Sequence, residues 1–431
     1  MTGWSAVLEA ARPVRAGTVS RVVGLGVDVR GVDAAVGDLV ALGDGVPAEV
    51  VAAEGATLRC MPLGLTDGLR VGDAVAPASG RLRVPTGRAL LGRVLDGLGR
   101  PIDGRGPVRA AAVPLDHEPP SAMHRERITE PLVTGIRAID TLTPLGRGQR
   151  MGLFAGSGVG KSSLLSMIAR GSSASANVIA LVGERGREVR EFLEDDLGPE
   201  GLARSVVVVS TSDQPAMARL RAASTATRIA EAFRDDGDDV VLMMDSLTRV
   251  AMAQREIGLA AGEPPATRGY PPSTFPVLAR LLERAGTDRR GSITGIYTVL
   301  VEGDDHNEPV ADTVRSILDG HLVLDRALAV TGHHPAIDVL GSVSRLSGKV
   351  ASAEQRRLAT ALRTVLAARD EARDLIAIGA YHPGANRRVD AAVSAEAAIA
   401  AFLRQDLDER TPAEESWRRL HDLVAAFGDI S

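Results

Sequence analysis

Only one cysteine, Cys60, is present in the chain, so no disulfide can form within it, and this usage suits a reducing compartment. Aromatic residues make up 3% of the sequence, which leaves few side chains for stacking on single-stranded nucleic acid. Lys and Arg number 50 against 55 Asp and Glu, so the basic excess typical of nucleic-acid binders is also missing. We therefore expect no nucleic-acid partner.

Long apolar runs and targeting signals are missing as well. No run approaches the ~20 apolar residues that a membrane-spanning helix needs. The N-terminus lacks the pattern of a signal peptide. We expect a cytoplasmic protein whose attachment to the inner face of the cell membrane is peripheral and depends on partners.

The order of local patterns divides the 431 residues into three predicted domains. Residues 14–83 are short β-rich runs separated by Gly and Asp, which indicates a small β-barrel. Strands and helices alternate after the barrel, and residues from 353 onward have a helical pattern. The predicted domains are residues 1–83, 84–350 and 351–431.

A short apolar stripe precedes the barrel. Trp4, Val7, Leu8 and Ala11 recur at helical spacing, and Pro13 ends the pattern. This stripe either packs on its own protein or docks a partner, and the sequence leaves both open.

A glycine-rich loop at residues 155–162 has the complete pattern of a phosphate-binding loop. Gly156, Gly158 and Gly160 are expected to take positive φ and bring backbone N–H groups close to a polyphosphate. Lys161 adds a charge for the β/γ-phosphates, and Ser162 offers a hydroxyl to Mg²⁺. The residues that we predict to bind the nucleotide phosphates are Gly156, Ser157, Gly158, Val159, Gly160, Lys161, Ser162 and Ser163.

The segments after this loop alternate between apolar strands and helices, which predicts a parallel sheet covered on both faces. Ligands of such sheets bind at the carboxyl ends of the strands. Asp245 directly follows one apolar strand, the expected place for a carboxylate that holds Mg²⁺ through water. Glu184 follows another and can polarise an attacking water. Glu188 is a competing choice that spacing does not exclude.

Several stretches together resemble one known family: residues 91–101, 152–165, 183–192, 245–275 and 335–345. Between residues 16 and 392 the chain resembles the catalytic ATPases of type III protein export, relatives of the β subunit of rotary ATP synthase. Residues 262–273 are especially typical of the export branch. Within it, the chain looks most like the flagellar export ATPase, with the injectisome ATPase next. The resemblance implies an α/β fold: a RecA-like P-loop core with a mostly parallel sheet, an N-terminal β-barrel and a C-terminal helical domain.

The resemblance also implies residue roles. Lys161 and Asp245 take part in catalysis, Glu184 matches the catalytic base, and Arg185 matches a contact to the γ-phosphate. Arg345 matches an arginine finger that acts on the neighbouring subunit's nucleotide, which implies a ring, usually a hexamer.

The resemblance implies two residues that contact the adenine base. His334 stands where the family usually has a Tyr that stacks on the base, and Tyr381 matches a second aromatic at the same pocket. The expected cofactors are ATP and Mg²⁺, the latter held by Ser162 and Asp245.

The resemblance implies further partners. They are a stator-like regulator protein, a central stalk protein, export gate membrane proteins and chaperone–cargo complexes. In the family the segment before the barrel docks the regulator, and it is shorter here than in typical flagellar members. The loop at residues 262–273 either faces a central channel, where it meets stalk or cargo, or is an ordinary surface loop.

Four other functions are weighed against flagellar export. An injectisome ATPase shares all of these motifs. A non-catalytic nucleotide-binding ring subunit usually lacks the carboxylate that Glu184 supplies. An RNA translocase needs aromatic residues in its barrel, and residues 14–83 contain none. ATP synthase β normally carries a different loop sequence and a longer C-terminal domain.

Overall fold

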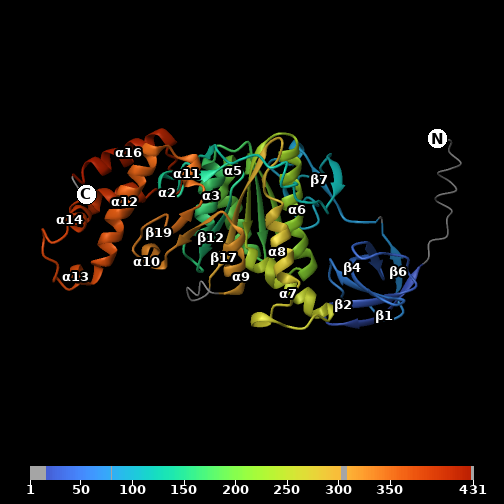
Figure 1. Ribbon diagram of the computed structural model, residues 1–431. Helices are drawn as coiled ribbons and strands as arrows, with labels where there is room; N and C mark the ends of the chain where they lie inside the picture. Colours follow the sequence, from blue (N-terminus) through green and yellow to red (C-terminus); the bar gives the residue numbers. More distant parts are fainter. Residues whose placement is uncertain (1–15, 79, 302–307, 429–431) are drawn as a thin grey trace.

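The computed structural model describes residues 16–78, 80–301 and 308–428, and Figure 1 shows them as three successive parts. A β-barrel comes first, a large sheet with helices on both faces follows, and a group of helices ends the chain. The predicted α/β fold class is therefore confirmed. The stripe at Trp4 lies outside the described residues. No helix of the described part of the chain is long and apolar enough to cross a membrane.

The barrel is closed, so the strands of its sheet have no free edge, and every strand pair in it is antiparallel. Its interior is filled by small apolar side chains, among them Val29, Val50 and Cys60. Burial raises the pKa of the Cys60 thiol to about 12. In barrel order the strands are β1 (Gly17–Val23), β2 (Gly26–Arg30), β5 (Thr57–Pro62), β4 (Val46–Glu54), β3 (Leu39–Leu42) and β6 (Ala74–Pro77).

The central sheet is parallel except at β19 and β16, which run antiparallel to their neighbours. The strands in spatial order are β19 (Ile337–Ser344), β18 (Gly320–Leu324), β12 (Arg150–Ala155), β17 (Ser292–Leu300), β15 (Asp239–Asp245), β13 (Ala176–Val182), β14 (Ser205–Ser210) and β8 (Val94–Asp96), with β16 (Gly286–Thr287) beside β17. Two small sheets flank it: β7 (Arg83–Thr86) with β9 (Ala111–Pro114), and β10 (Pro131–Leu132) with β11 (Leu145–Gly146).

The inner strands are mostly apolar because both faces of the sheet are covered. In β13, Val178 and Ala180 join the core on the side of helix α6 (Ala216–Asp235). Ile179 and Leu181 join the core on the side of helix α3 (Lys161–Gly171). The other helices of this part are α2 (Arg137–Leu142), α4 (Gly186–Glu191), the π-helix η2 (Phe192–Leu197), α5 (Gly198–Ala203), α7 (Leu247–Ala261), α8 (Thr274–Glu283), α9 (Pro309–Ile317), α10 (Arg326–Val330) and α11 (Ser347–Val350), together with the short 3-10 turns at Arg88–Leu90 and Thr267–Gly269.

The C-terminal helices are bound to the central part by polar contacts as well as apolar ones. Arg137 of α2 is buried, and it donates from Nε to the carbonyl of Phe402 at 3.0 Å and from Nη1 to Thr411 at 2.9 Å. These helices are α12 (Ala353–Glu371), α13 (Arg373–Ala377), α14 (Arg387–Ser394), α15 (Glu396–Leu403) and α16 (Ala413–Ala425).

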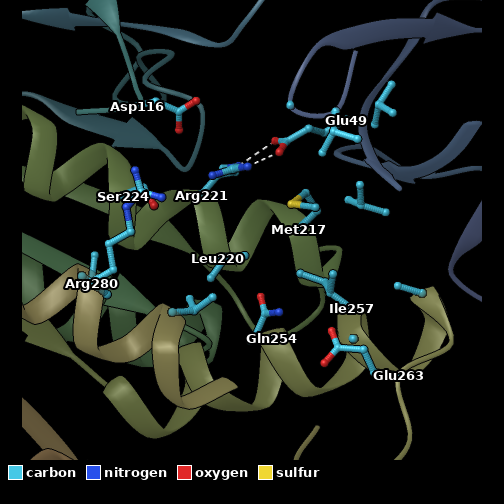
Figure 2. A pocket seen from close by; sticks show the side chains of 18 of the residues that line it. Glu49, Asp116, Met217, Leu220, Arg221, Ser224, Gln254, Ile257, Glu263 and Arg280 are labelled. Carbon is cyan, nitrogen blue, oxygen red and sulfur yellow. Dashed lines mark hydrogen bonds and ion pairs between the residues drawn. The ribbon is translucent and has the colours of Figure 1, made fainter. Parts of the chain in front are cut away.

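A polar contact also joins the barrel to the central part. Arg221 of α6 donates from Nε to the Glu49 carboxylate of β4 at 2.7 Å, and Figure 2 shows this pair at the wall of a cavity of about 330 Å³. Arg59 of β5 donates to the carbonyl of Ala261 at 3.2 Å. The barrel is therefore held against α6 and the end of α7.

Candidate nucleotide-binding site

The phosphate-loop residues connect the carboxyl end of β12 to the first turn of α3. Gly158 and Gly160 have φ of 74° and 92°, in the region that favours glycine. Gly160 caps α3, so the free N–H groups of the first helical turn lie at the loop. The expectation of positive φ at Gly156 is wrong. A Cβ on Gly156 would lie 3.0 Å from Nη2 of Arg326, the end of a flexible side chain.

The sheet brings Lys161, Glu184 and Asp245 together, although they are far apart in the sequence. Lys161 Nζ lies 2.6 Å from Oδ1 of Asp245 and 3.5 Å from Oε1 of Glu184. Asp245 ends β15, and Glu184 follows β13, which pairs directly with β15. Because both strands are parallel to β12, their carboxyl ends meet at the phosphate loop.

The charges of this cluster depend on one another. Burial acts to lower the pKa of Lys161, but the Asp245 and Glu184 carboxylates outweigh it and raise that pKa. Burial raises the pKa of Glu184 to about 7, and the repulsion of Asp245 and Glu188 adds to this while Lys161 opposes it. Glu184 is thus a carboxylate that can accept a proton near neutral pH, as a general base must.

The donor set fits a magnesium nucleotide. The Ser162 hydroxyl and the Asp245 carboxylate are oxygen ligands of the kind that Mg²⁺ prefers. Added side-chain atoms on Gly158 would meet nothing within 4 Å, so the loop backbone is open to a ligand. Lys161, the first residue of α3 after the loop, neutralises the Asp245 and Glu184 carboxylates.

Arg185 and Glu188, on the exposed side of Glu184, pair with each other at 3.2 Å. The Arg185 side chain is 79% exposed, and its contact to the γ-phosphate stays a prediction. Glu188 is paired with this arginine while Glu184 lies beside Lys161. The choice of Glu184 over Glu188 as the base stays a prediction.

Arg345 lies at the opposite end of the strands, beside the amino end of β18. β19 runs antiparallel to β18, pairing Ile337 with Leu324 and Ser344 with Gly320. Leu324 in turn pairs with Ala155, the last residue before the phosphate loop. The 8 residues of β19 therefore separate Arg345 from its own phosphate loop by roughly 25 Å. Arg345 is exposed, and its side chain has no hydrogen bond or ion pair among the described residues.

The two predicted adenine contacts lie in different parts of the chain. His334 is exposed and adjoins the phosphate loop, because a Cβ on Gly160 would come 3.9 Å from its Nδ1. Tyr381 precedes α14, where its hydroxyl lies 2.9 Å from the Asp390 carboxylate and accepts from the Asn386 N–H at 3.3 Å. Its role at the base stays a prediction.

Two arginines at the site were not predicted from the sequence. Arg326, at the start of α10, donates to the carbonyl of Ser157 at 3.2 Å and so supports the phosphate loop. Arg249 of α7 packs on Gly183, and its buried Nε has no hydrogen-bond partner in the described residues. The sequence signal that could have indicated Arg249 is its position four residues after Asp245, the predicted Mg²⁺ ligand.

Matches to models of protein families show the class to which this protein belongs. Residues 135–344 match the model of the ATP synthase alpha/beta family, nucleotide-binding domain. Residues 351–422 match the model of the T3SS EscN ATPase C-terminal domain. The chain is an ATP hydrolase built on the ATP synthase α/β nucleotide-binding domain.

Individual relatives place the chain more narrowly. It is 51% identical over 417 residues to the flagellum-specific ATP synthase of Bacillus subtilis, with 95% of each chain covered. It is 52% identical over 377 residues to the SPI-2 type 3 secretion system ATPase of Salmonella typhimurium, covering 88% of this chain and 87% of that one. The assembled ATPase EscN of enteropathogenic E. coli matches with a TM-score of 0.89 at 42% identity, over 95% of this chain and 100% of that chain. The chain belongs to the family of flagellum-specific ATP synthases and type III secretion ATPases, which confirms the predicted resemblance.

Proposed function

We propose that this ATP hydrolase is the ring-forming motor of flagellar type III protein export. The observation that carries the proposal is a separation: Lys161, Glu184 and Asp245 meet at the carboxyl ends of the parallel strands, and Arg345, the proposed finger, lies at the amino end of β18. In a ring, the side of one subunit that carries Arg345 faces the side of the next subunit that carries Lys161, Glu184 and Asp245. Each site is then completed by its neighbour.

The residues of the chain divide the reaction among them. Lys161 exchanges its carboxylate partners for the β/γ-phosphates, while the phosphate-loop N–H groups fix the polyphosphate. Ser162 and Asp245 hold Mg²⁺, which neutralises phosphate charge when bound. Glu184, the base, orients the attacking water and accepts its proton. Arg345 of the neighbouring subunit stabilises the charge that develops at the γ-phosphate, and Arg185 assists on the near side.

In this proposal a ring, usually a hexamer in the family, is not needed for nucleotide binding but is needed for turnover. The relatives support assembly: EscN is known as an assembled ATPase and in a complex with its central stalk EscO. We infer that this chain likewise binds a stalk protein, and that a stator-like regulator, chaperone–cargo complexes and export gate proteins meet the ring at the cytoplasmic face of the membrane.

Flagellar export is proposed over the injectisome because the flagellum-specific ATP synthase of Bacillus subtilis is 51% identical over 95% of this chain, whereas two type 3 secretion system ATPases with similar coverage, 93% and 95%, are 49% and 48% identical. The flagellum-specific ATP synthases of Treponema pallidum and Pseudomonas aeruginosa are each 49% identical, over 96% and 97% of this chain. An injectisome ATPase is the second candidate, favoured by the likeness to the SPI-2 enzyme over a shorter length.

The proposal is tested by replacing the gene in its own organism with one that encodes Lys161→Ala. Loss of Lys161 removes the charge that binds phosphate, so secretion of flagellar hook protein into the medium should fall to the level of a gene deletion. The matched control is Lys349→Ala, which removes an exposed lysine outside the phosphate loop. Normal hook secretion by the Lys161→Ala strain would refute the proposal, and loss of injectisome substrates instead would favour the second candidate.

A further inference from the structure

Thr298, a buried residue of β17, contacts the reaction centre through its side chain. β17 lies between β12, which leads into the phosphate loop, and β15, which ends on Asp245. Thr298 is fully buried, and its Oγ1 is 2.7 Å from Oδ1 of Asp245 and 3.3 Å from the carbonyl of Met244. A hydroxyl has one proton to donate, and a carboxylate at the shorter distance is the stronger acceptor. The Thr298 hydroxyl therefore donates to Asp245.

This contact makes the two oxygens of Asp245 different from each other. Oδ1 receives both the Thr298 hydroxyl at 2.7 Å and the Lys161 ammonium at 2.6 Å. Within the described ranges, no hydrogen bond or ion pair reaches Oδ2. The carboxylate is thus held by one oxygen and has the other available for a ligand.

We propose that Thr298 is a positioning residue for Mg²⁺ binding: its hydroxyl anchors Oδ1 of Asp245 and so presents Oδ2 to a water of the metal. This inference rests on the proposed function, in which Lys161 leaves Asp245 when phosphate binds. After that exchange, Thr298 is the side chain among the described contacts that still holds the carboxylate. Groups that orient a metal ligand in this way commonly change metal affinity by about 10- to 100-fold when they are removed.

The experiment compares nucleotide binding with and without the metal. Thr298→Val removes the hydroxyl and keeps the branched shape, Thr298→Ala removes it with a smaller side chain, and Thr298→Ser keeps it. Thr294→Val is the matched control, because Thr294 lies on the same strand and face and is 1% exposed. Its hydroxyl accepts from the Gly148 N–H at 2.9 Å, at the other end of the sheet. The readout is the dissociation constant of a fluorescent ATP analogue in EDTA and along a Mg²⁺ titration.

We expect Thr298→Val and Thr298→Ala to bind the analogue in EDTA within about twofold of the wild type, which also shows that they are folded. Their Mg²⁺ midpoint should rise about tenfold, whereas Thr298→Ser and Thr294→Val should follow the wild type. An unchanged midpoint in Thr298→Val would overturn the inference, and so would an equal rise in Thr294→Val. A wild-type protein whose nucleotide binding ignores Mg²⁺ would instead refute the metal-holding role that the proposed function assigns to Ser162 and Asp245.

Discussion

Mixing two inactive variants tests most directly whether Arg345 completes the site of a neighbouring subunit. Arg345→Ala subunits lack the proposed finger and keep Glu184, while Glu184→Gln subunits lack the base and keep Arg345. Arg345→Ala alone should lose about 10³-fold or more of its turnover, the usual contribution of a finger supplied by another subunit, and Glu184→Gln alone about 10²–10⁴-fold, the contribution of a general base. Since β19 places Arg345 at the end of the strands remote from its own phosphate loop, neither subunit can complete a site by itself.

The expected recovery follows from the geometry. In rings assembled at random from equal amounts, half of the sites contain Glu184, and half of those face a neighbour that carries Arg345. About one quarter of the sites are then complete, so turnover should rise more than about a hundredfold over Arg345→Ala alone. The assay is phosphate release at fixed total protein, measured after the two variants are mixed as monomers and allowed to assemble.

A second mixture provides the control. Lys161→Ala and Glu184→Gln both damage the same pocket of one subunit, since Lys161 lies 3.5 Å from Glu184. No mixed ring of these two variants contains a complete site, so their mixture should remain inactive. Recovery in this control, or no recovery in the first mixture although rings form, would contradict an arginine that acts across the subunit boundary.

Two further predictions concern single residues. Glu184→Gln alone should keep nucleotide affinity and lose about 10²–10⁴-fold in turnover, because only the proton acceptor is removed. Equilibrium binding measures the affinity, and single-turnover hydrolysis measures the rate. An unchanged turnover would exclude Glu184 as the base. Arg284→Met should lower the free energy of unfolding by about 3–5 kcal/mol, because Glu231 is fully buried and receives hydrogen bonds from Arg284 at 2.7 and 2.8 Å. Burial acts to raise the pKa of Glu231, but Arg284 and His117 lower it to about 2, so this stabilisation should be lost as the pH falls from 4.5 toward 2. Urea unfolding of the wild type and of Glu231→Gln across that range checks the sign, and parallel pH profiles would contradict it.

The residues that could be predicted from the sequence are those whose position follows from local pattern. A phosphate loop is read directly from its spacing, and the carboxyl ends of parallel strands must meet at one edge of their sheet. For that reason the sequence alone is enough to predict that Lys161, Glu184 and Asp245 lie together.

The residues that could not be predicted depend on long-range geometry. Thr298 sits in an apolar strand, where threonine is an ordinary strand former, and only the register of β17 beside β15 reveals its contact. Arg326 reaches the carbonyl of Ser157 across 169 positions of sequence. The remote place of Arg345 depends on the antiparallel direction of β19, which no pattern in the sequence specifies.

That direction of β19 has a mechanical consequence. His334, just before the strand, adjoins the phosphate loop of its own subunit, and Arg345, just after it, is exposed at the far side. In the proposed ring, the single strand β19 thus connects the nucleotide of its own subunit, at His334, to the nucleotide of the neighbouring subunit, at Arg345. An extended strand can hardly lengthen, so a displacement at one nucleotide is passed to the next guanidinium. The order in which the subunits hydrolyse ATP would then be set by the direction in which the β19 strands run around the ring.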